Sequence, residues 1–445
     1  MAIKHFEADI IVAGAGTAGC YFAWRMGQAG FKTLVLEAKT LTSLGEHIEI
    51  FHMDKIRFDE FNIPHPTPEE LIHTEDTSYT WSPDMKVKQT INYTFYVMSM
   101  PAFIQRMQRY VRDSGGTIVE HAKISDVIME GKQLIGVKGE VDGEPFEARG
   151  KLVVDASGLA AAVRTRLPAD FGVEIKPVPP ADCLYVCLEL RDEIPDGFPT
   201  GSNSYLFHKA FWNKSWGAGA ILGIGQPGSF DYAWKKHQEW REEYFGDPGK
   251  VLRRRQGVVP YHRPPFSLVG NGFMVVGDAA NQNKPFSGEG VTSGFTACQI
   301  AAEVASAALK KGETSREALW AYNVRYFRSQ GAKFASGLAQ LPAVAELTRE
   351  DVNYLFRHNI IFSGKDFEEL NTNYEINMGT GKLISIGLAL LWGVITGQFK
   401  FSSLKKFLAA SGTAGQLKAH YMRFPETPAG FEIWVDEARS LWRER

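Results

Sequence analysis

The chain has 445 residues, which is too long for one ordinary hydrophobic core and indicates two or three interlocked domains. Hydrophobic residues make up 44% of it and charged residues 22%, a balance typical of globular proteins rather than disordered ones. The net charge of −2 gives no electrostatic basis for binding nucleic acid, so we expect no nucleic-acid partner.

The four cysteines form no CxxC pair and have no metal-ligand spacing, which is typical of a reducing compartment. We expect Cys183 and Cys187, four residues apart in an apolar run, to be buried as small hydrophobic residues. His47, Glu49 and His52 match no common metal motif, so we predict no metal site. No signal-peptide pattern precedes the first apolar segment, which favours a cytoplasmic protein, either free or membrane-associated.

Residues 9–37 predict a strand, a tight turn, a helix and a second strand in immediate succession. A short apolar strand leads into the glycine turn GAGTAG, and a helix follows it. The second strand ends at Glu37. The glycines therefore lie within a βαβ unit closed by an acid, which is the context that makes a GxGxxG pattern specific for a dinucleotide.

Each glycine of this turn has its own expected role. Gly14 permits the tight turn, Gly16 lets the backbone approach a pyrophosphate, and Gly19 lets the helix lie close to the strand. Free N–H groups at the helix N-terminus attract the phosphates, and Glu37 is placed to accept hydrogen bonds from a ribose. The fingerprint by itself is compatible with FAD and with NAD.

The next hundred residues predict a mixed region that interrupts the nucleotide fold. Residues 91–99 are rich in aromatic and β-branched residues and predict a strand, and residues 101–114 predict an amphipathic helix. Short alternating segments over 117–149 indicate hairpins. Residues 151–157 then predict a buried strand that runs into Asp155, where the nucleotide fold resumes.

Residues 175–225 change in character and predict a second sheet, with strands at 183–190, 204–211 and 217–224. An aromatic cluster accompanies these strands: Tyr205, Phe207, Phe211, Trp212 and Trp216. Such a cluster suits an aromatic wall facing a ligand and equally suits dense core packing.

A second GxGxxG pattern follows at Gly223, Gly225 and Gly228. No second strand ending in an acid comes after it at the expected distance, and residues 231–245 predict a polar helix. We therefore do not expect a second nucleotide-binding domain here.

The last third of the chain contains another apolar strand closing on an acid, at residues 272–278. A polar loop with glycines follows, and then a helix over 293–311 whose small residues allow close packing, so we expect a second contact with the dinucleotide. Residues 313–445 predict a helical region. Within it, residues 383–399 are uncharged and predict a buried helix, with the wall of a lipid site or a marginal membrane span as alternatives.

Three blocks of the sequence together resemble the FAD-dependent oxidoreductases of the p-hydroxybenzoate hydroxylase fold, and among them the geranylgeranyl reductase family. They are the Gly14–Gly19 turn with Glu37, the segment VDASG at 154–158 followed by Val163-Arg164, and GDAA at 277–280 followed by PFSGEG at 285–290. The segment GVVP at 257–260 also resembles that family, and the blocks span most of the first 310 residues.

The resemblance implies an α/β fold with a Rossmann-like FAD-binding domain, an interleaved antiparallel-sheet substrate domain and a helical C-terminal region. We expect the boundaries at 1–170 and 257–312 for the two parts of the FAD-binding domain, 171–256 for the substrate sheet and 313–445 for the helices. Asp278 would accept a hydrogen bond from the ribityl chain, and the loop after it would bring backbone N–H groups to the isoalloxazine edge. The expected cofactor-binding residues are Gly14, Gly16, Ala18, Gly19, Glu37, Asp278, Pro285, Gly288, Glu289 and Gly290.

The sequence departs from the family pattern at three places. Leu44-Gly45 stands where the family often has a Cys-Gly pair near the flavin, and Met100 stands where an arginine is often found. The aromatic-x-Trp-x-Phe-Pro run of the substrate sheet is replaced by YLFHKAF at 205–211.

The resemblance implies a reductase that saturates carbon–carbon double bonds of an isoprenoid or other lipid-like molecule with hydride from reduced FAD. Tyr205 and His208 are the candidates for the proton donor because they lie in the predicted substrate sheet. NADPH or a ferredoxin would supply the electrons, and peripheral membrane contact would suit a lipid substrate. A monooxygenase of the same fold, or a flavoprotein passing electrons to quinone, are the alternative functions.

Overall fold

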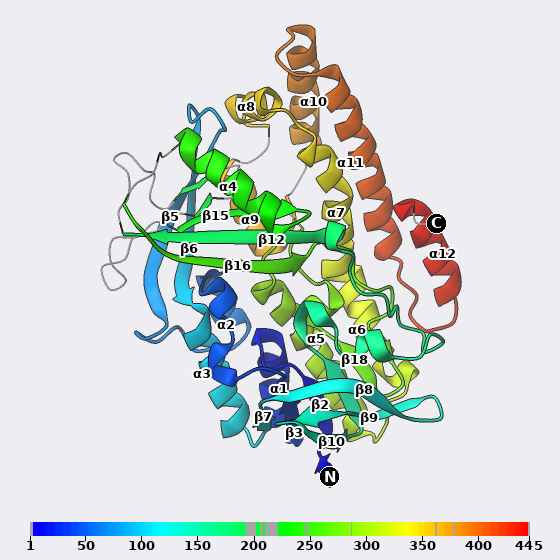
Figure 1. Ribbon diagram of the computed structural model, residues 1–445. Coiled ribbons are helices and arrows are strands. Elements are labelled where there is room, and N and C mark those ends of the chain that lie inside the picture. Colours follow the sequence, from blue (N-terminus) through cyan, green and yellow to red (C-terminus); the bar gives the residue numbers. More distant parts are fainter. Residues whose placement is uncertain are drawn as a thin grey trace.

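The computed structural model places two sheets of the nucleotide fold at one end of the molecule, two further sheets above them, and a helical region along one side (Figure 1). It describes residues 3–192, 202–204, 208–209, 221–244, 246, 249–285, 287–360, 363–376 and 379–443. The predicted fold class is confirmed, and the expected domain boundaries stay a prediction.

The nucleotide fold is centred on a parallel sheet whose strands come from three distant parts of the chain. In spatial order they are β17 (Val269–Gly270), β18 (Phe273–Val275), β11 (Leu152–Asp155), β2 (Ile10–Ala13), β3 (Thr33–Leu36) and β7 (Thr117–Val119). β17 alone runs antiparallel to its neighbour. The strands β2, β3, β11 and β18 are buried along their whole length, as expected for a parallel sheet covered on both faces.

Three helices pack together beside this sheet: α1 (Thr17–Gln28), α3 (Met100–Asp113) and α5 (Val291–Lys310). A four-stranded sheet contacts it through β8 and β9, with strand order β1 (Lys4–Glu7), β10 (Glu144–Arg149), β9 (Gln133–Val141) and β8 (Ala122–Glu130). Asp142 and Gly143 both have positive φ in the turn between β9 and β10, which confirms the hairpin predicted there.

The upper part of the molecule is built from two antiparallel-rich sheets. One has the order β15 (Ile221–Pro227), β12 (Cys183–Arg191) and β16 (Val251–Pro260). The other has the order β14 (His208–Lys209), β13 (Ser202–Ser204), β5 (Leu71–Trp81), β6 (Lys88–Ser99) and β4 (Ile50–Asp54). The short helix α2 (Lys55–Glu60) follows β4, and α4 (Phe230–Tyr244) packs on β12 and β15.

The second GxGxxG pattern lies in this part of the molecule. Gly223 and Gly225 are in β15, paired antiparallel with Val186 and Leu188 of β12. The pattern therefore does not open a βαβ unit, in agreement with the sequence-based interpretation. Cys183 and Cys187, both in β12, are buried as predicted.

The C-terminal third is helical, as predicted. Its elements are α6 (Arg316–Tyr326), a π-helical turn η7 (Phe327–Gly331), α7 (Ala332–Ala345), α8 (Arg349–Arg357), α9 (Gly364–Asn373), α10 (Thr380–Ile395), α11 (Phe401–Tyr421) and α12 (Phe431–Trp442). α11 lies along α7, and α9 packs on β6 of the upper sheet (Figure 1).

The prediction of a buried helix over 383–399 is wrong for one face of α10. Ile386 and Leu390 are buried, whereas Leu388 and Trp392 are 63% and 59% exposed. An apolar helix is fully buried only if neighbours surround it, and α10 stands at the end of the molecule with neighbours on one side (Figure 1). In the described part of the chain, no helix has both the length and the apolar character needed to cross a bilayer.

Candidate functional site

The glycine turn after β2 has a geometry that only glycine satisfies at two positions. Gly14 has a φ of +100°, and a Cβ there would lie 2.5 Å from the Ala156 carbonyl oxygen. A Cβ on Gly19 would lie 2.0 Å from the Gly14 carbonyl oxygen, because α1 starts directly against the turn. These two glycines allow β2, α1 and the end of β11 to meet at one point.

Gly16 is different, because a Cβ there would meet no atom of a described residue within 4 Å. It is the N-cap of α1, so the free N–H groups of that helix open beside it. A glycine with no protein neighbour at a helix N-terminus leaves room for a ligand to approach the backbone.

Glu37, directly after β3, is 8% exposed and closes the side of this turn. Its Oε2 accepts a hydrogen bond from the backbone N–H of Ala15 over 2.9 Å, and Oε1 accepts from the N–H of Lys39 over 2.9 Å. Each carboxylate oxygen keeps a second lone pair, so Glu37 is fixed in place and still able to accept hydrogen bonds.

The second predicted segment, 277–290, packs directly on the first. Gly277 has a φ of +66° and begins a 3-10 turn, η6 (Gly277–Ala280), and a Cβ on it would lie 2.9 Å from Ala18 Cβ. The Sγ of Cys298, in α5, lies 3.5 Å from the Ala18 carbonyl oxygen. Two segments about 260 residues apart in sequence thus meet at Ala18, and this convergence is the central expectation from the sequence.

Asp278 lies in η6 beside the start of α5. Burial raises the pKa of its carboxyl to about 6, and a hydrogen bond with Asn283 partly offsets the rise. An ideal Cβ on Gly290, the N-cap of α5, would lie 3.0 Å from Asp278 Oδ1 and 2.3 Å from Asn283 Oδ1. Gly290 therefore lets the loop close tightly around these two side chains.

Three buried oxygens near this loop have no hydrogen-bond partner among the described residues: Asn281 Oδ1, Asn283 Oδ1 and Thr292 Oγ1. Leaving such atoms unpaired costs free energy, so polar groups of a ligand are their natural partners. Hydroxyl and N–H groups of a flavin nucleotide fit this set, since both kinds of group donate hydrogen bonds. The open space at Gly16 and these unpaired acceptors therefore fit a flavin dinucleotide.

The loop at 284–290 also carries a buried group of charges that sequence reasoning missed. Lys284 is 6% exposed, its Nζ lies 2.9 Å from Glu289 Oε2 and 4.0 Å from Asp54 Oδ2, and Glu289 also pairs with His52. Burial alone would lower the pKa of Lys284, but the Glu289 and Asp54 carboxylates hold it above the usual lysine value. We call Asp54, Lys284, Glu289 and His52 the charge cluster.

Asp54 sits at the end of β4 and is 2% exposed. Burial raises the pKa of its carboxyl although Lys284 and Arg57 act against the rise. Arg57 Nε lies 3.6 Å from Asp54 Oδ2, and that oxygen accepts no hydrogen bond from the described residues. Tyr374, after α9, brings the helical region to the same place, because Arg57 lies 4.8 Å from its ring centroid and Lys284 5.6 Å.

The other predicted residues are placed as follows. Pro285 is buried, Gly288 has a φ of +69°, and Phe286 lies outside the described residues. Tyr205 and the aromatic residues 207, 211, 212 and 216 also lie outside them, and only the backbone of His208 is described, in β14. The prediction of Tyr205 or His208 as proton donor stays untested.

The shared segment at Asp155 has a structural role. Its carboxylate accepts hydrogen bonds from the hydroxyl of Ser157 over 2.6 Å and from the backbone N–H groups of Val163 and Arg164 over 2.9 and 2.7 Å. Arg164 then donates from Nε to the Ala279 carbonyl over 2.9 Å. This chain of bonds links the end of β11 to the η6 loop.

Two departures from the family pattern touch each other. Gly45 has a φ of +88°, and a Cβ there would lie 2.9 Å from Met100 Cγ. Gly45 therefore packs closely on Met100 at the start of α3, where the family often has a Cys-Gly pair and an arginine.

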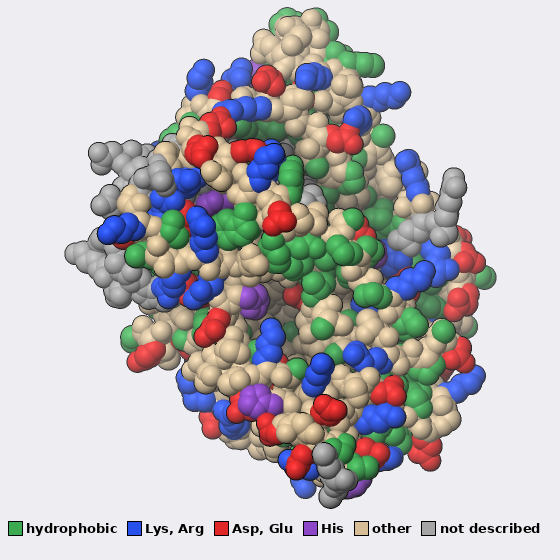
Figure 2. Space-filling view, viewed as in Figure 1, with side chains coloured by type: hydrophobic (Ala, Val, Ile, Leu, Met, Phe, Trp, Pro, Cys, Tyr) green, Lys and Arg blue, Asp and Glu red, His purple; other side chains and the backbone are tan. Residues whose placement is uncertain are grey.

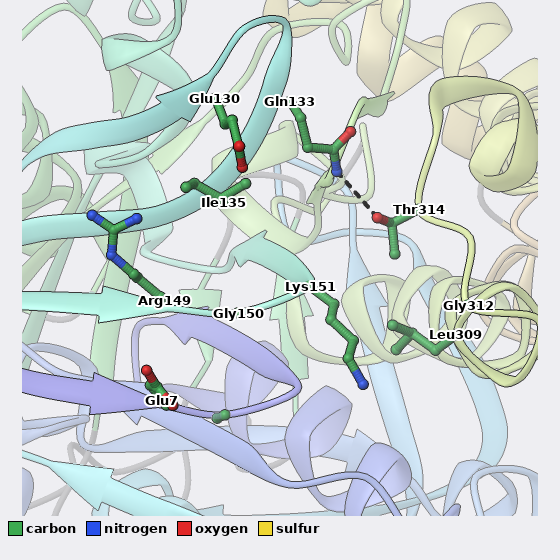
Figure 3. Close-up of a pocket in the computed structure, with 11 residues that line it drawn as sticks. Glu7, Glu130, Gln133, Ile135, Arg149, Gly150, Lys151, Leu309, Gly312 and Thr314 are labelled. Carbon is green, nitrogen blue, oxygen red and sulfur yellow. Dashed lines mark hydrogen bonds between the residues drawn. The ribbon is translucent and has the colours of Figure 1, made fainter.

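A cavity of about 440 Å³ lies elsewhere, between the strand ends of the four-stranded sheet and the end of α5 (Figure 3). Gln133 donates to Thr314 Oγ1 over 3.1 Å across its rim, and Lys151 pairs with Asp9 at 2.8 Å. Its lining contains none of the predicted cofactor-binding residues, so the candidate site is not located there.

Comparison with known proteins agrees with this geometry. Residues 9–175 match the model of a family described as FAD dependent oxidoreductase. A digeranylgeranylglycerophospholipid reductase from Sulfolobus acidocaldarius is 25% identical over 459 aligned positions that cover 99% of each chain. A second protein of that name, from Methanococcoides burtonii, is 25% identical over 90% of this chain and 99% of its own.

Solved structures share the fold. A geranylgeranyl bacteriochlorophyll reductase-like protein from Thermoplasma acidophilum superposes with a TM-score of 0.72 at 17% identity, over 93% of this chain and all of the other. A flavin-dependent brominase gives a TM-score of 0.56 at 14% identity, over 99% of this chain and all of its own. With the glycine turn and the η6 loop meeting at Ala18, these similarities indicate an FAD-dependent oxidoreductase that is similar along its whole length to digeranylgeranylglycerophospholipid reductases.

Proposed function

We propose that this protein uses FAD to saturate carbon–carbon double bonds of a geranylgeranyl-type isoprenoid lipid. The observation that carries the proposal is the end-to-end alignment with proteins named digeranylgeranylglycerophospholipid reductase, which covers 99% of both chains in one case. The halogenase and monooxygenase structures with the same fold are 14–16% identical, which supports the fold and gives no argument for their substrates.

The residues that would hold FAD come from the two converging segments. Gly14, Gly16 and Gly19 would place the pyrophosphate at the N-terminus of α1, with Ala18 in the first turn of that helix. Glu37 would accept hydrogen bonds from the adenosine ribose through its remaining lone pairs.

The η6 loop would hold the flavin half of the cofactor. Asp278 would accept a hydrogen bond from the ribityl chain, and the buried Asn283 Oδ1 would gain a donor that no described residue supplies. Pro285, Gly288, Glu289 and Gly290 would shape the loop beside the ring system, where the N-terminus of α5 favours negative charge. When bound and reduced, FAD supplies a hydride, and saturation of an alkene then needs one proton from another source.

We assign that proton to the carboxyl of Asp54. Burial raises its pKa, so the group holds a proton at higher pH than an exposed aspartate does. Lys284 and Arg57 lie at 4.0 and 3.6 Å from Oδ2, and they keep the group able to give the proton up by stabilising the carboxylate that remains. Asp54 belongs to the charge cluster of the 284–290 loop, so the proton is held beside the expected flavin ring.

Asp54 is buried, and Phe95 lies opposite it where β4 pairs with β6. The Tyr93 and Phe95 rings lie 5.1 Å apart, and the His52 ring lies 5.1 Å from that of Phe95. A site without water suits the transfer of hydride to an isolated alkene, because water would otherwise solvate the charges that develop during the reaction and react with its intermediates.

We further propose that the electrons come from NADPH or a ferredoxin-type protein. The second GxGxxG pattern of the sequence begins in the antiparallel strand β15 and does not open a βαβ unit. This supports an electron donor that docks transiently over one that is held in a second nucleotide-binding domain. Steady-state turnover with each donor, under anaerobic conditions, distinguishes the two.

The experiment that tests the function is a single anaerobic turnover. The FAD-loaded protein is reduced with dithionite and mixed with a geranylgeranyl-type lipid, and the return of the yellow flavin colour is followed. We expect reoxidation together with a product that has gained two hydrogen atoms for each saturated bond. Reoxidation by quinones alone would indicate an electron carrier, and a hydroxylated product formed only with oxygen would indicate a monooxygenase.

Replacement of Asp54 tests the proton assignment in the same assay. Asp54→Asn cannot deliver a proton, so reoxidation by the lipid should slow by about tenfold to a thousandfold, while FAD affinity stays unchanged. Asp76→Asn is the matched control, because that carboxylate is exposed and bonded to Thr94 at 2.8 Å. An Asp54→Asn variant that reoxidises at the original rate would remove Asp54 from the mechanism and leave the reductase assignment intact.

A further inference from the structure

Helix α10 is apolar on two opposite faces. Ile386 and Leu390 are buried against α8 together with Phe399, which follows the helix. The opposite face carries large apolar side chains at helical spacing, all more than half exposed; we call this the outer face: Ile384, Leu388, Leu391, Trp392 and Ile395.

The outer face is held rigidly by the contacts beneath it. Tyr354, in α8, donates from its hydroxyl to the Ala389 carbonyl over 2.6 Å, and a Cβ on Gly393 would lie 2.6 Å from the ring of Tyr354. Asp351 accepts hydrogen bonds from the backbone N–H of Lys400 over 2.9 Å and from the Ser403 hydroxyl over 2.7 Å. α8 therefore fixes both α10 and the start of α11.

The neighbouring helix α11 extends the exposed apolar surface. Phe401 is 68% exposed and Leu408 is 61% exposed, seven residues apart on one side of the helix. The α10–α11 pair forms one end of the molecule, and Figure 2 shows hydrophobic side chains gathered there with basic ones below them. Contiguous exposed apolar surface of this kind marks an interaction site.

The charge of this segment identifies the kind of partner. Between Glu375 and Glu426 the sequence contains no acidic residue, and its basic residues are Lys382, Lys400, Lys405, Lys406, Lys418 and Arg423. Lys382, Lys406 and Lys418 pair with carboxylates of other segments, whereas no ion pair to a described residue involves Lys400 or Lys405. An apolar face flanked by uncompensated lysines is complementary to anionic lipid headgroups.

We propose that the outer face of α10, together with Phe401 and Leu408, docks this protein on the surface of a bilayer that contains anionic lipid. The helix lies in the interface, with its apolar side chains below the headgroups and Lys400 and Lys405 at the phosphates. A second copy of the chain fits this surface less well, because it would bring two basic segments together. The inference rests on exposure and charge and does not depend on the proposed reaction.

The test is co-sedimentation of the FAD-loaded protein with vesicles of phosphatidylcholine containing phosphatidylglycerol. We expect binding that weakens as salt is raised, and that falls by roughly fivefold for each of Lys400→Gln and Lys405→Gln. Leu388→Glu with Ile395→Glu should abolish binding, since charged residues replace the inserted apolar ones. Retention of the flavin spectrum and of the urea unfolding midpoint shows that the variant is folded.

Matched controls are available on other helices. Ile433→Glu changes an apolar residue of α12 that is also 68% exposed, and Lys235→Gln removes a lysine of α4. Both variants should bind vesicles as the unaltered protein does. Fluorescence quenching by brominated lipid should be reduced in Trp392→Phe. Equal vesicle binding by the Leu388→Glu and Ile395→Glu double variant, or loss of a dimer instead of loss of vesicle binding, would overturn the proposal.

Discussion

The glycine turn and the charge cluster are the two halves of the candidate site, and they are specified in different ways. The turn is fixed by close backbone contacts, within the turn itself and with Ala156 at the end of β11, so any Cβ on Gly14 or Gly19 would collide with a carbonyl oxygen. The cluster joins side chains from β4 and from the loop before α5, and its geometry depends on the balance of buried charges. The first should therefore respond to added volume at any pH, and the second to lost charge in a way that changes with pH.

The largest effect should come from removing the cation of the cluster. In Lys284→Met, the buried Asp54 carboxylate and the half-buried Glu289 carboxylate lose the ammonium group that neutralises them. We expect this loss to lower the free energy of unfolding by about 3–5 kcal/mol near neutral pH. The loss should be smaller at pH 5, because carboxylates without a cation have raised pKa values in the folded state and become protonated as the pH falls. Urea unfolding at pH 5 and pH 8 measures both effects.

A double variant separates charge from packing at this position. The double variant Lys284→Met with Glu289→Gln removes one of the two carboxylates that have lost their cation. It should therefore recover part of the unfolding free energy that the single variant loses at pH 8. A loss that is the same at both pH values, with no recovery in the double variant, would mean that Lys284 acts through packing alone.

The next effect should come from adding volume to the turn. Gly19→Ala places a Cβ 2.0 Å from the Gly14 carbonyl oxygen, so the start of α1 must move away from β2. We expect a loss of roughly 1–3 kcal/mol in unfolding free energy and loss of bound FAD. Unlike the Lys284 variant, the stability loss should be equal at pH 5 and pH 8, and a strong pH dependence would contradict the steric explanation.

A smaller and more selective effect is expected at Gly16. The methyl group of Gly16→Ala would meet no atom of the residues that the structure describes within 4 Å, so the apoprotein should unfold at the same urea concentration within error. FAD affinity should fall by about tenfold or more, because the added methyl group occupies space that the pyrophosphate needs. Titration of the apoprotein with FAD measures the affinity, and a stability loss as large as that of Gly19→Ala would show that Gly16 has a structural role instead.

These differences explain what the sequence could predict. The turn was readable because its strand, glycines, helix and Glu37 lie within 29 residues, and each glycine role follows from backbone geometry alone. The charge cluster was not, because Asp54 and Lys284 are 230 residues apart and neither belongs to a recognisable spacing. Their meeting depends on how β4 and the η6 loop are packed.

Helix α10 shows a second limit. Its apolar residues surround the helix, and this pattern predicts burial whenever neighbours are unknown. The structure places neighbours on one side only, so Ile386 is buried and Leu388 is exposed. The sequence holds one signal that favours exposure. Lysines flank the apolar part of the helix, and no acidic residue lies between Glu375 and Glu426 to balance their charge, whereas a helix buried in a protein core needs no flanking charge.

The smallest effect should be a pH dependence of FAD binding through Asp278, which lies in the η6 turn outside the charge cluster. Burial raises the pKa of this carboxyl to about 6 in the protein without cofactor, and a hydroxyl that donates to it favours the ionised form. Bound FAD should therefore lower this pKa, and by linkage the affinity should rise as the pH increases towards 6 and level off above it. The change amounts to about tenfold for each unit by which the pKa falls. Asp278→Asn cannot titrate, so its affinity should be lower at neutral pH and should lack this dependence. FAD titrations of both proteins at pH 5 and pH 7.5 decide the matter, because equal pH profiles would mean that Asp278 does not touch the cofactor.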